Sequence, residues 1–86
     1  MKIGLPGVTS LKEKRRILKS LMQRLRNDFN LSVSEVGLND VHRQALVAAA
    51  VVANEGAFAH AVIDKAIDKV RSKADIILGD FNVETY

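Results

Sequence analysis

The first third of the chain constrains the fold most, because residues 6–36 join a turn, a capped helix and a strand in one unit. Ser10 precedes Glu13 by three residues, the spacing at which a serine hydroxyl caps the glutamate amide and the carboxylate returns to the serine amide. Apolar residues then recur at three- and four-residue steps: Leu11, Leu18, Leu21, Met22, Leu25 and Phe29. We therefore predict a helix from Ser10 to about Phe29 with one apolar stripe facing a core.

A turn and two strands flank this helix. Pro6-Gly7 predicts a type II turn, because proline fixes φ at the second turn position and glycine accepts the positive φ of the third. Residues 31–36 are rich in β-branched and small polar side chains, which is typical of a strand. Only residues 1–5 precede the turn, so a first strand here is short.

The second half of the chain repeats the order of strand and helix. Residues 45–53 are apolar at every position, which favours a central strand covered on both faces. Asn54 is placed to cap a helix over residues 55–72. The expected buried face of that helix consists of Phe58, Ala59, Val62, Ile63, Ala66, Ile67 and Val70.

A last strand is predicted over residues 76–78 and 81–83, which completes the order β-α-β-β-α-β. Right-handed crossovers then give a two-layer α+β sandwich: a four-stranded antiparallel sheet of order 4-1-3-2 with both helices on one face. The other face stays partly apolar. The short first strand is central in this topology, so its neighbours should lack hydrogen-bond partners over part of their length.

We expect one domain over residues 1–86, and its bare sheet face leaves two interpretations open. In the first, the sheet face or an edge strand forms a homo-oligomer such as a dimer, since domains of this size often gain stability by association. In the second, the small alanines of residues 45–53 leave too little apolar area to matter.

Composition excludes several classes of protein. Of the 86 residues 48% are hydrophobic and one is proline, so the chain is not a disordered tail. It contains no cysteine, which excludes disulfides and thiolate metal sites. We see neither a signal-peptide pattern nor an apolar run that could span a bilayer, and therefore expect a cytoplasmic protein without a membrane partner.

Candidate catalytic groups are few. His42 and His60 lack carboxylates at metal-ligand spacing, so we expect solvated histidines. Asp64 and Asp68 lie among lysines and an arginine, where ion pairing accounts for them. Ser10 is used by the helix cap and no base is placed to activate it. We therefore expect no enzymatic activity, no metal and no cofactor.

Positive charge is concentrated in the first helix. Residues 10–30 hold seven basic and two acidic side chains, a net +5, whereas the rest of the chain holds six basic and eight acidic ones, a net −2. The candidate nucleic-acid-binding residues lie on one flank of the helix: Lys12, Arg15, Arg16, Lys19 and Arg26. Such an array can neutralise several phosphates. The alternative is a solvated face with good helix propensity that only maintains solubility.

The sequence PGVTSLKEKRRILKSLMQRLRNDFNLSVSEV, followed by VVAN at residues 51–54, closely resembles the YlxP-like family of small bacterial proteins, a domain of unknown function. The resemblance implies a ferredoxin-like fold, a genomic neighbourhood of translation-initiation and ribosome-maturation genes, and no established activity. Family members usually carry a longer first strand before the Pro-Gly turn. They commonly have an aromatic residue in a Trp-Gln-Arg-like run where this chain has Val41-His42-Arg43-Gln44.

Charge and the implied genomic setting together predict a non-enzymatic accessory protein that binds RNA or the ribosome through the first helix. Residues 45–53 carry no aromatic side chain on which bases could stack, so contacts to phosphates are expected. One alternative is a translation-related protein whose carboxylates pair with the arginines. Another is a homo-oligomeric module that binds a small ligand. Acylphosphatases share this topology, but the sequence lacks their close Gly-to-Arg spacing, which disfavours that enzyme.

Overall fold

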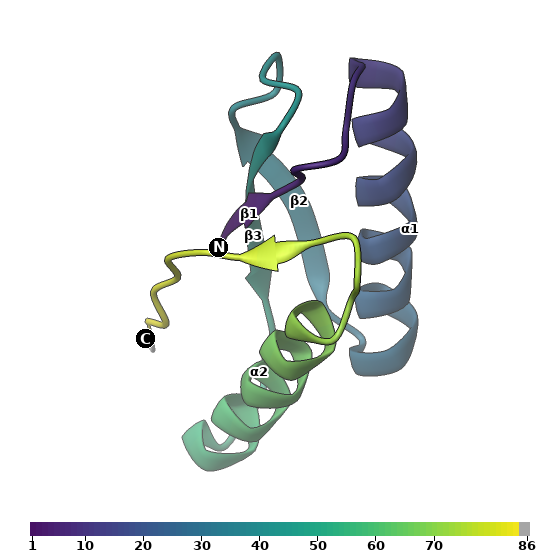
Figure 1. The fold of residues 1–86 in the computed structure, drawn as a ribbon. Helices are drawn as coiled ribbons and strands as arrows, with labels where there is room; N and C mark the ends of the chain where they lie inside the picture. The colour runs from purple at the N-terminus through teal and green to yellow at the C-terminus, as the bar shows by residue number, and fades with distance from the viewer. Residues whose placement is uncertain (85–86) are drawn as a thin grey trace.

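Residues 1–84, which the computed structural model describes, form a four-stranded antiparallel sheet with two helices against one face (Figure 1). The elements are β1 (Lys2–Gly4), α1 (Leu11–Phe29), β2 (Ser32–Gly37), β3 (Gln44–Ala50), α2 (Gly56–Arg71) and β4 (Ile77–Leu78). The strand order is β2-β3-β1-β4, which read from the other edge is the predicted order 4-1-3-2. The predicted α+β sandwich is confirmed.

The first helix, α1, begins where the capping pattern places it. The Glu13 amide donates to Ser10 Oγ at 3.2 Å, as predicted. The Glu13 carboxylate accepts from the Thr9 hydroxyl at 3.3 Å instead of returning to the Ser10 amide, so half of the predicted capping box forms. The helix ends at Phe29, and the C-cap residue Asn30 has a left-handed φ of 52°, a common conformation at helix C-termini.

The core lies between the two helices and the sheet. Leu18, Leu21 and Leu25 of α1 are buried as predicted, and they pack with Ala45 and Val47 of β3 in one apolar cluster. The other members of the predicted stripe lie half-buried at the margin of this cluster: Leu11, Met22 and Phe29. The helix is therefore fixed to the sheet along one side and leaves its outer side to solvent.

The turn between β1 and α1 differs from the predicted type. The amide of Val8 donates to the carbonyl of Leu5 at 3.1 Å, which closes a turn across Pro6 and Gly7. No glycine of the described residues has a positive φ, so this turn is not type II. The sequence located the turn, but its conformation does not use the freedom of Gly7.

The start of α2 also differs from the prediction. Glu55, not Asn54, is the N-cap residue, and its side chain makes no capping hydrogen bond. Phe58 was predicted to be buried but is 61% exposed, whereas Ala66 and Val70 are buried. The reason is that the first turns of α2 extend beyond the end of the sheet, and only its last turns cover it (Figure 1).

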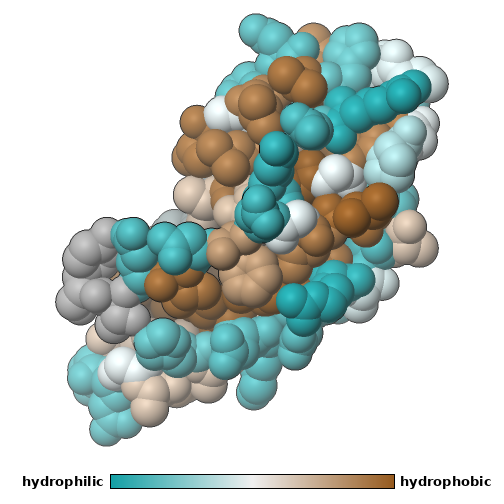
Figure 2. All heavy atoms as spheres, turned by 60° about the vertical axis from the view of Figure 1, so that its left-hand side comes forward, coloured by the Kyte–Doolittle hydropathy of each residue, from teal (hydrophilic) through white to brown (hydrophobic). Residues whose placement is uncertain are grey.

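Only one face of β3 is covered, so the prediction of a strand buried on both faces is wrong. Side chains alternate between buried and exposed along the strand, and it ends at Ala50 instead of continuing to Ala53. The bare face is partly apolar, as expected: Val36, Leu46 and Ile77 are 56%, 38% and 60% exposed. Figure 2 shows apolar side chains between hydrophilic ones on this side of the molecule.

The last strand is shorter than predicted. β4 contains only Ile77–Leu78, and residues 81–83 are not in a strand. The last two hydrogen bonds between this segment and β1 lie just after β4. The Gly79 amide donates to the Lys2 carbonyl and the Lys2 amide donates to the Asp80 carbonyl, each at 2.8 Å. Because β1 has three residues, residues 81–83 have no neighbouring strand within the described residues 1–84 to pair with.

Candidate functional site

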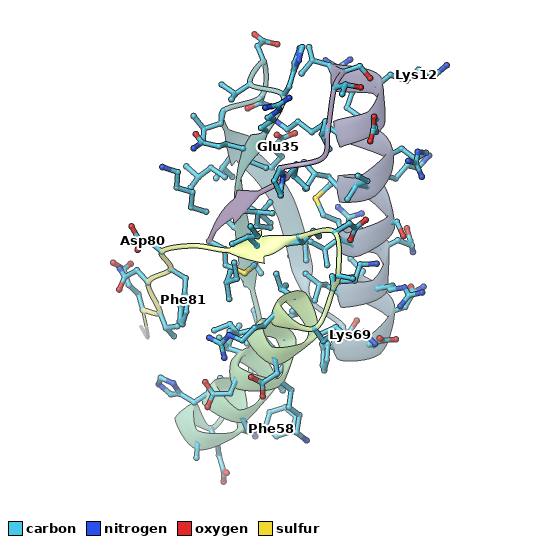
Figure 3. All side chains as sticks on the ribbon, viewed as in Figure 1. Lys12, Glu35, Phe58, Lys69, Asp80 and Phe81 are labelled. Carbon is cyan, nitrogen blue, oxygen red and sulfur yellow. The ribbon has the colours of Figure 1, made fainter. Side chains whose placement is uncertain are left out.

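Four basic side chains lie together on the outer side of α1. Lys12, Arg15, Arg16 and Lys19 are all exposed, and we call them the basic face. At about 100° per residue they fall within an arc of roughly 100°, and at 1.5 Å per residue they span about 10 Å of the helix axis. Figure 3 shows Lys12 at one end of this array, pointing away from the sheet.

None of these four cations is neutralised by an acidic neighbour among residues 1–84. The ion pairs of the described chain lie elsewhere, at Lys14–Glu35, Lys69–Asp28 and Arg71–Asp68. Glu13, the nearby carboxylate of the same helix, accepts a hydrogen bond from Thr9. The basic face therefore presents its charge to solvent, where an anionic ligand can approach it.

Arg26, the fifth predicted binding residue, has a different environment. Its Nη2 atom donates to the carbonyl of Val33 in β2 at 2.6 Å, which links the end of α1 to the edge strand. It also lies about 10 Å further along the helix than Lys19. Arg26 is therefore engaged with the fold, and the basic face is defined without it.

Lys14 is counted among the basic residues of α1, but its side chain is fully buried. Its Nζ atom donates to the carbonyls of Leu38 at 2.6 Å, Val41 at 2.8 Å and Asn39 at 3.4 Å. A carboxylate oxygen of Glu35 lies 2.9 Å from the same ammonium. A charge removed from water requires partners of this kind. The Lys14 ammonium therefore has a structural role and cannot contribute to a ligand-binding surface.

Sequence reasoning missed Lys14, although a signal was present. The residue precedes Leu18, Leu21 and Leu25 by four, seven and eleven positions, so it belongs to the apolar stripe by helical spacing. A lysine at such a position must either extend its aliphatic stem so that the ammonium reaches solvent or bind buried hydrogen-bond acceptors. Here the acceptors come from the connection between β2 and β3, which local patterns do not identify.

The acceptors of Lys14 belong to a turn in an unusual conformation. Leu38 has a left-handed φ of 59°, which is uncommon for a residue other than glycine, asparagine or aspartate. The Val41 amide donates to the Leu38 carbonyl at 3.0 Å and closes the turn. Because Lys14 binds three carbonyls of this turn, α1 holds it in place; we call this arrangement the lysine clamp. Arg43 adds a second link, since its Nε donates to the carbonyl of Val8 at 3.1 Å.

Groups suited to catalysis do not gather in the described part of the chain. No three histidine, aspartate or glutamate side chains of residues 1–84 lie close enough to hold a metal ion. His42 is exposed in the connection after β2, and Asp68 pairs with Arg71 at 3.5 Å on the surface of α2, as the sequence predicted. No helix within residues 1–84 combines the length and apolarity that crossing a membrane requires.

Comparison with known proteins identifies the family of this chain but not its function. The model of a family described as protein of unknown function (DUF503) matches residues 1–83. The uncharacterized protein YlxP of Bacillus subtilis (strain 168) is 42% identical over 45 residues, which are 52% of this chain and 49% of that protein. The match thus spans about half the length of this relative, and neither description names a substrate or a partner.

Proposed function

The chain belongs to the DUF503 family, and we propose that this member is a non-enzymatic accessory protein that binds RNA, alone or in the ribosome, through the basic face of α1. The observation that carries the proposal is the array of four exposed cations without acidic partners among residues 1–84. Free positive charge on one side of a rigid helix is the expected footprint of a polyanion-binding protein.

The chemistry of the basic face suits phosphate. Arg15 and Arg16 carry planar guanidinium groups that can bind two phosphate oxygens at once, while lysine ammonium groups act as point charges. The array spans about 10 Å of helix axis, roughly the rise of three nucleotides along one strand of a duplex. It is therefore suited to several consecutive phosphates of one strand, and not to a single small anion.

We expect the protein to recognise the shape and charge of RNA and not its base sequence. The strands of the described sheet carry no aromatic side chain, so bases have no stacking platform on it of the kind that RNA-recognition motifs use. Contacts to phosphates position a protein on a nucleic acid but carry no sequence information. The proposal thus favours structured RNA with weak dependence on sequence.

Binding should weaken steeply with salt, and the size of the loss in affinity can be predicted. Neutralising four phosphates gives a slope of about −2.8 to −3.6 in log K against log salt, so affinity should fall roughly 50- to 150-fold between about 50 and 200 mM. We would titrate purified protein into labelled structured RNA and into ribosomal subunits across this range. Salt-independent binding would contradict the proposed mode.

A charge-reversal pair shows whether α1 carries the interaction. The variant R15E/R16E/K19E leaves the apolar stripe untouched and should abolish binding. The control K65E/R71E/K73E changes the net charge equally, from +3 to −3, but acts at α2 and just after its end, and should retain most of the affinity. Equal losses in the two variants would show that net charge alone matters and would sink the assignment to α1.

The same experiment separates RNA from an acidic protein partner. Arginine forks also pair with carboxylates, and both interactions weaken with salt. Complexes isolated from cells should therefore be treated with nuclease before the bound material is identified. Release of the protein supports RNA as the ligand, whereas retention on another protein after nuclease treatment would replace RNA by a carboxylate-rich partner at the same face.

A further inference from the structure

The outer side of α1 changes its chemistry beyond the basic face. Gln23 and Asn27 follow Lys19 by four and eight positions, and both are exposed. At about 100° per residue, Gln23 falls within the arc of the basic face and Asn27 lies about 20° outside it. Arg26 shares this arc, but its guanidinium is hydrogen-bonded to the Val33 carbonyl. The outer side of the helix thus presents free cations in its first half and side-chain amides in its second; we call Gln23 and Asn27 the amide pair.

The two acidic side chains of α1 lie off this track. Glu13 accepts a hydrogen bond from the Thr9 hydroxyl, and Asp28 lies 3.6 Å from the ammonium of Lys69 in α2. By helical geometry Asp28 is about 100° from Asn27 around the helix, so α2 approaches α1 on a different flank. Figure 1 shows the sheet and α2 on one side of α1, with its other side open. A ligand on the basic face can therefore extend along the helix to the amide pair.

The amide pair is oriented by a hydrogen bond between its own members. Gln23 Nε2 donates to Asn27 Oδ1 at 3.1 Å. Each amide carries two donor hydrogens and a carbonyl oxygen that accepts. Among residues 1–84 this bond leaves the Gln23 carbonyl oxygen as an acceptor and the Asn27 amino group as a donor. The amide pair can therefore donate to a ligand and accept from it at once, whereas lysine and arginine can only donate.

This difference matches the two polar groups of a ribonucleotide strand. Phosphate oxygens accept hydrogen bonds, which suits the cations of the basic face. The ribose 2′-hydroxyl both donates and accepts, which suits the amide pair, and it is the group by which a protein distinguishes RNA from DNA. None of the exposed side chains of α1 is aromatic, so unpaired bases have no stacking partner along this track. The track is therefore suited to the backbone of RNA and not to its bases.

The spacing of the two groups favours a double helix over a flexible strand. The centres of the basic face and of the amide pair are about 14 Å apart along one rigid helix. A single strand would lose conformational freedom in order to present phosphates and hydroxyls at that fixed separation. A duplex of A-form RNA is already ordered, and its wide, shallow minor groove displays the 2′-hydroxyls beside the phosphates.

On the basis of the function proposed above, on which this inference depends, we propose that α1 binds double-helical RNA with the basic face on the phosphates and the amide pair in the minor groove, against 2′-hydroxyls. The basic face supplies the affinity for a polyanion and treats RNA and DNA alike. The amide pair supplies the preference for RNA, because a DNA duplex offers it no hydroxyl to bind.

Titrations of the unmodified protein with three labelled duplexes of one sequence test this preference. The duplexes have about 16 base pairs and consist of RNA, of DNA, and of 2′-fluoro RNA, which keeps the A form and the charge but has no hydroxyl. Two additional hydrogen bonds should make the RNA duplex bind roughly 5- to 150-fold more tightly than either of the others at the same salt concentration. Equal affinity for RNA and 2′-fluoro RNA would overturn the proposal, since shape and charge would then suffice.

A matched pair of variants tests the assignment to the amide pair. Q23A/N27A should lower the affinity for the RNA duplex to that for the DNA duplex and leave the affinity for DNA unchanged. The control Q44A/N54A removes the same two types of side chain from exposed positions outside α1 and should keep the preference for RNA. A preference for RNA that persists in Q23A/N27A would overturn the proposal.

The variant R15E/R16E/K19E separates a failure of this proposal from a failure of the proposed function. It should lose the RNA and the DNA duplex alike. If the parent protein binds both duplexes equally and this variant binds neither, the basic face retains its role and only the hydroxyl contact is overturned. If the parent protein binds none of the three duplexes, or is held by a protein after nuclease treatment, the proposed function and this inference are both overturned.

Discussion

Replacing Lys14 by methionine is expected to remove a large part of the stability of this domain, although the same replacement of an exposed lysine on a helix would ordinarily change stability little. Methionine preserves the length of the buried stem but removes the ammonium. The Glu35 carboxylate then loses its cation at 2.9 Å, and the carbonyls of Leu38 and Val41 lose donors at 2.6 and 2.8 Å. The turn that the lysine clamp holds would have to rearrange or accept water.

The size of the loss can be bounded from these contacts. Breaking a buried ion pair by removing one partner costs about 3–5 kcal/mol, and an orphaned buried acceptor costs about 1–3 kcal/mol. The lower figures apply, because Glu35 keeps 17% of its side-chain surface exposed and its carboxylate can turn toward solvent once the ammonium is gone, although the oxygen that faces Lys14 is buried in the native structure. We expect about 3–5 kcal/mol in total, against a stability of roughly 4–13 kcal/mol for a domain of 86 residues.

Urea unfolding followed by far-UV circular dichroism measures this loss, since the chain contains no tryptophan. Lys12→Met, on the exposed side of the same helix, is the matched control and should stay within about 0.5 kcal/mol of the parent. In the double variant with Glu35→Gln the losses should not add, because each change removes the same ion pair. A loss below about 1 kcal/mol for Lys14→Met would refute the clamp.

Five further substitutions test the packing and the cap by the same unfolding assay. Leu18→Ala or Leu25→Ala should each cost about 2–5 kcal/mol, because both side chains are at most 1% exposed; a loss under about 1 kcal/mol would contradict the core assignment. Ser10→Ala should cost about 1 kcal/mol through loss of the cap to the Glu13 amide, and Ser10→Thr should restore most of it. Phe58→Ser should change stability by no more than about 0.5 kcal/mol, whereas a buried phenylalanine would cost several.

Local patterns were sufficient for the helices, the strand order and the covered face. Ser10 and Glu13 mark the start of α1, and the spacing of Leu18, Leu21 and Leu25 identifies its buried side. The topology follows from chirality, because right-handed crossovers allow few arrangements of these elements. These features depend on neighbours in sequence or on general rules, so no distant contact had to be known.

The features that were missed depend on contacts between distant segments. Lys14 is buried because carbonyls 24 to 27 residues away point at it. Residues 81–83 alternate apolar and polar side chains but are not in a strand, because β1, the strand that β4 pairs with, contains only Lys2–Gly4. Phe58 has the right helical phase for burial, but phase does not reveal that the sheet stops before the first turns of α2. In each case tertiary context overrides a correct local preference.

The two sides of α1 have separate physical roles, and this makes the proposed function accessible to experiment. The inner side is held by leucine packing and by an ammonium whose charge is used within the fold, so changes there act on stability. The basic face makes no ion pair among residues 1–84, so changes there leave the fold intact. A change at Arg26 would affect both charge and stability, because its guanidinium donates a hydrogen bond to the Val33 carbonyl. A loss of binding on reversal of Arg15, Arg16 and Lys19 with an unchanged unfolding curve therefore reports the interface itself, whereas the same loss at Arg26 would not distinguish contact from folding.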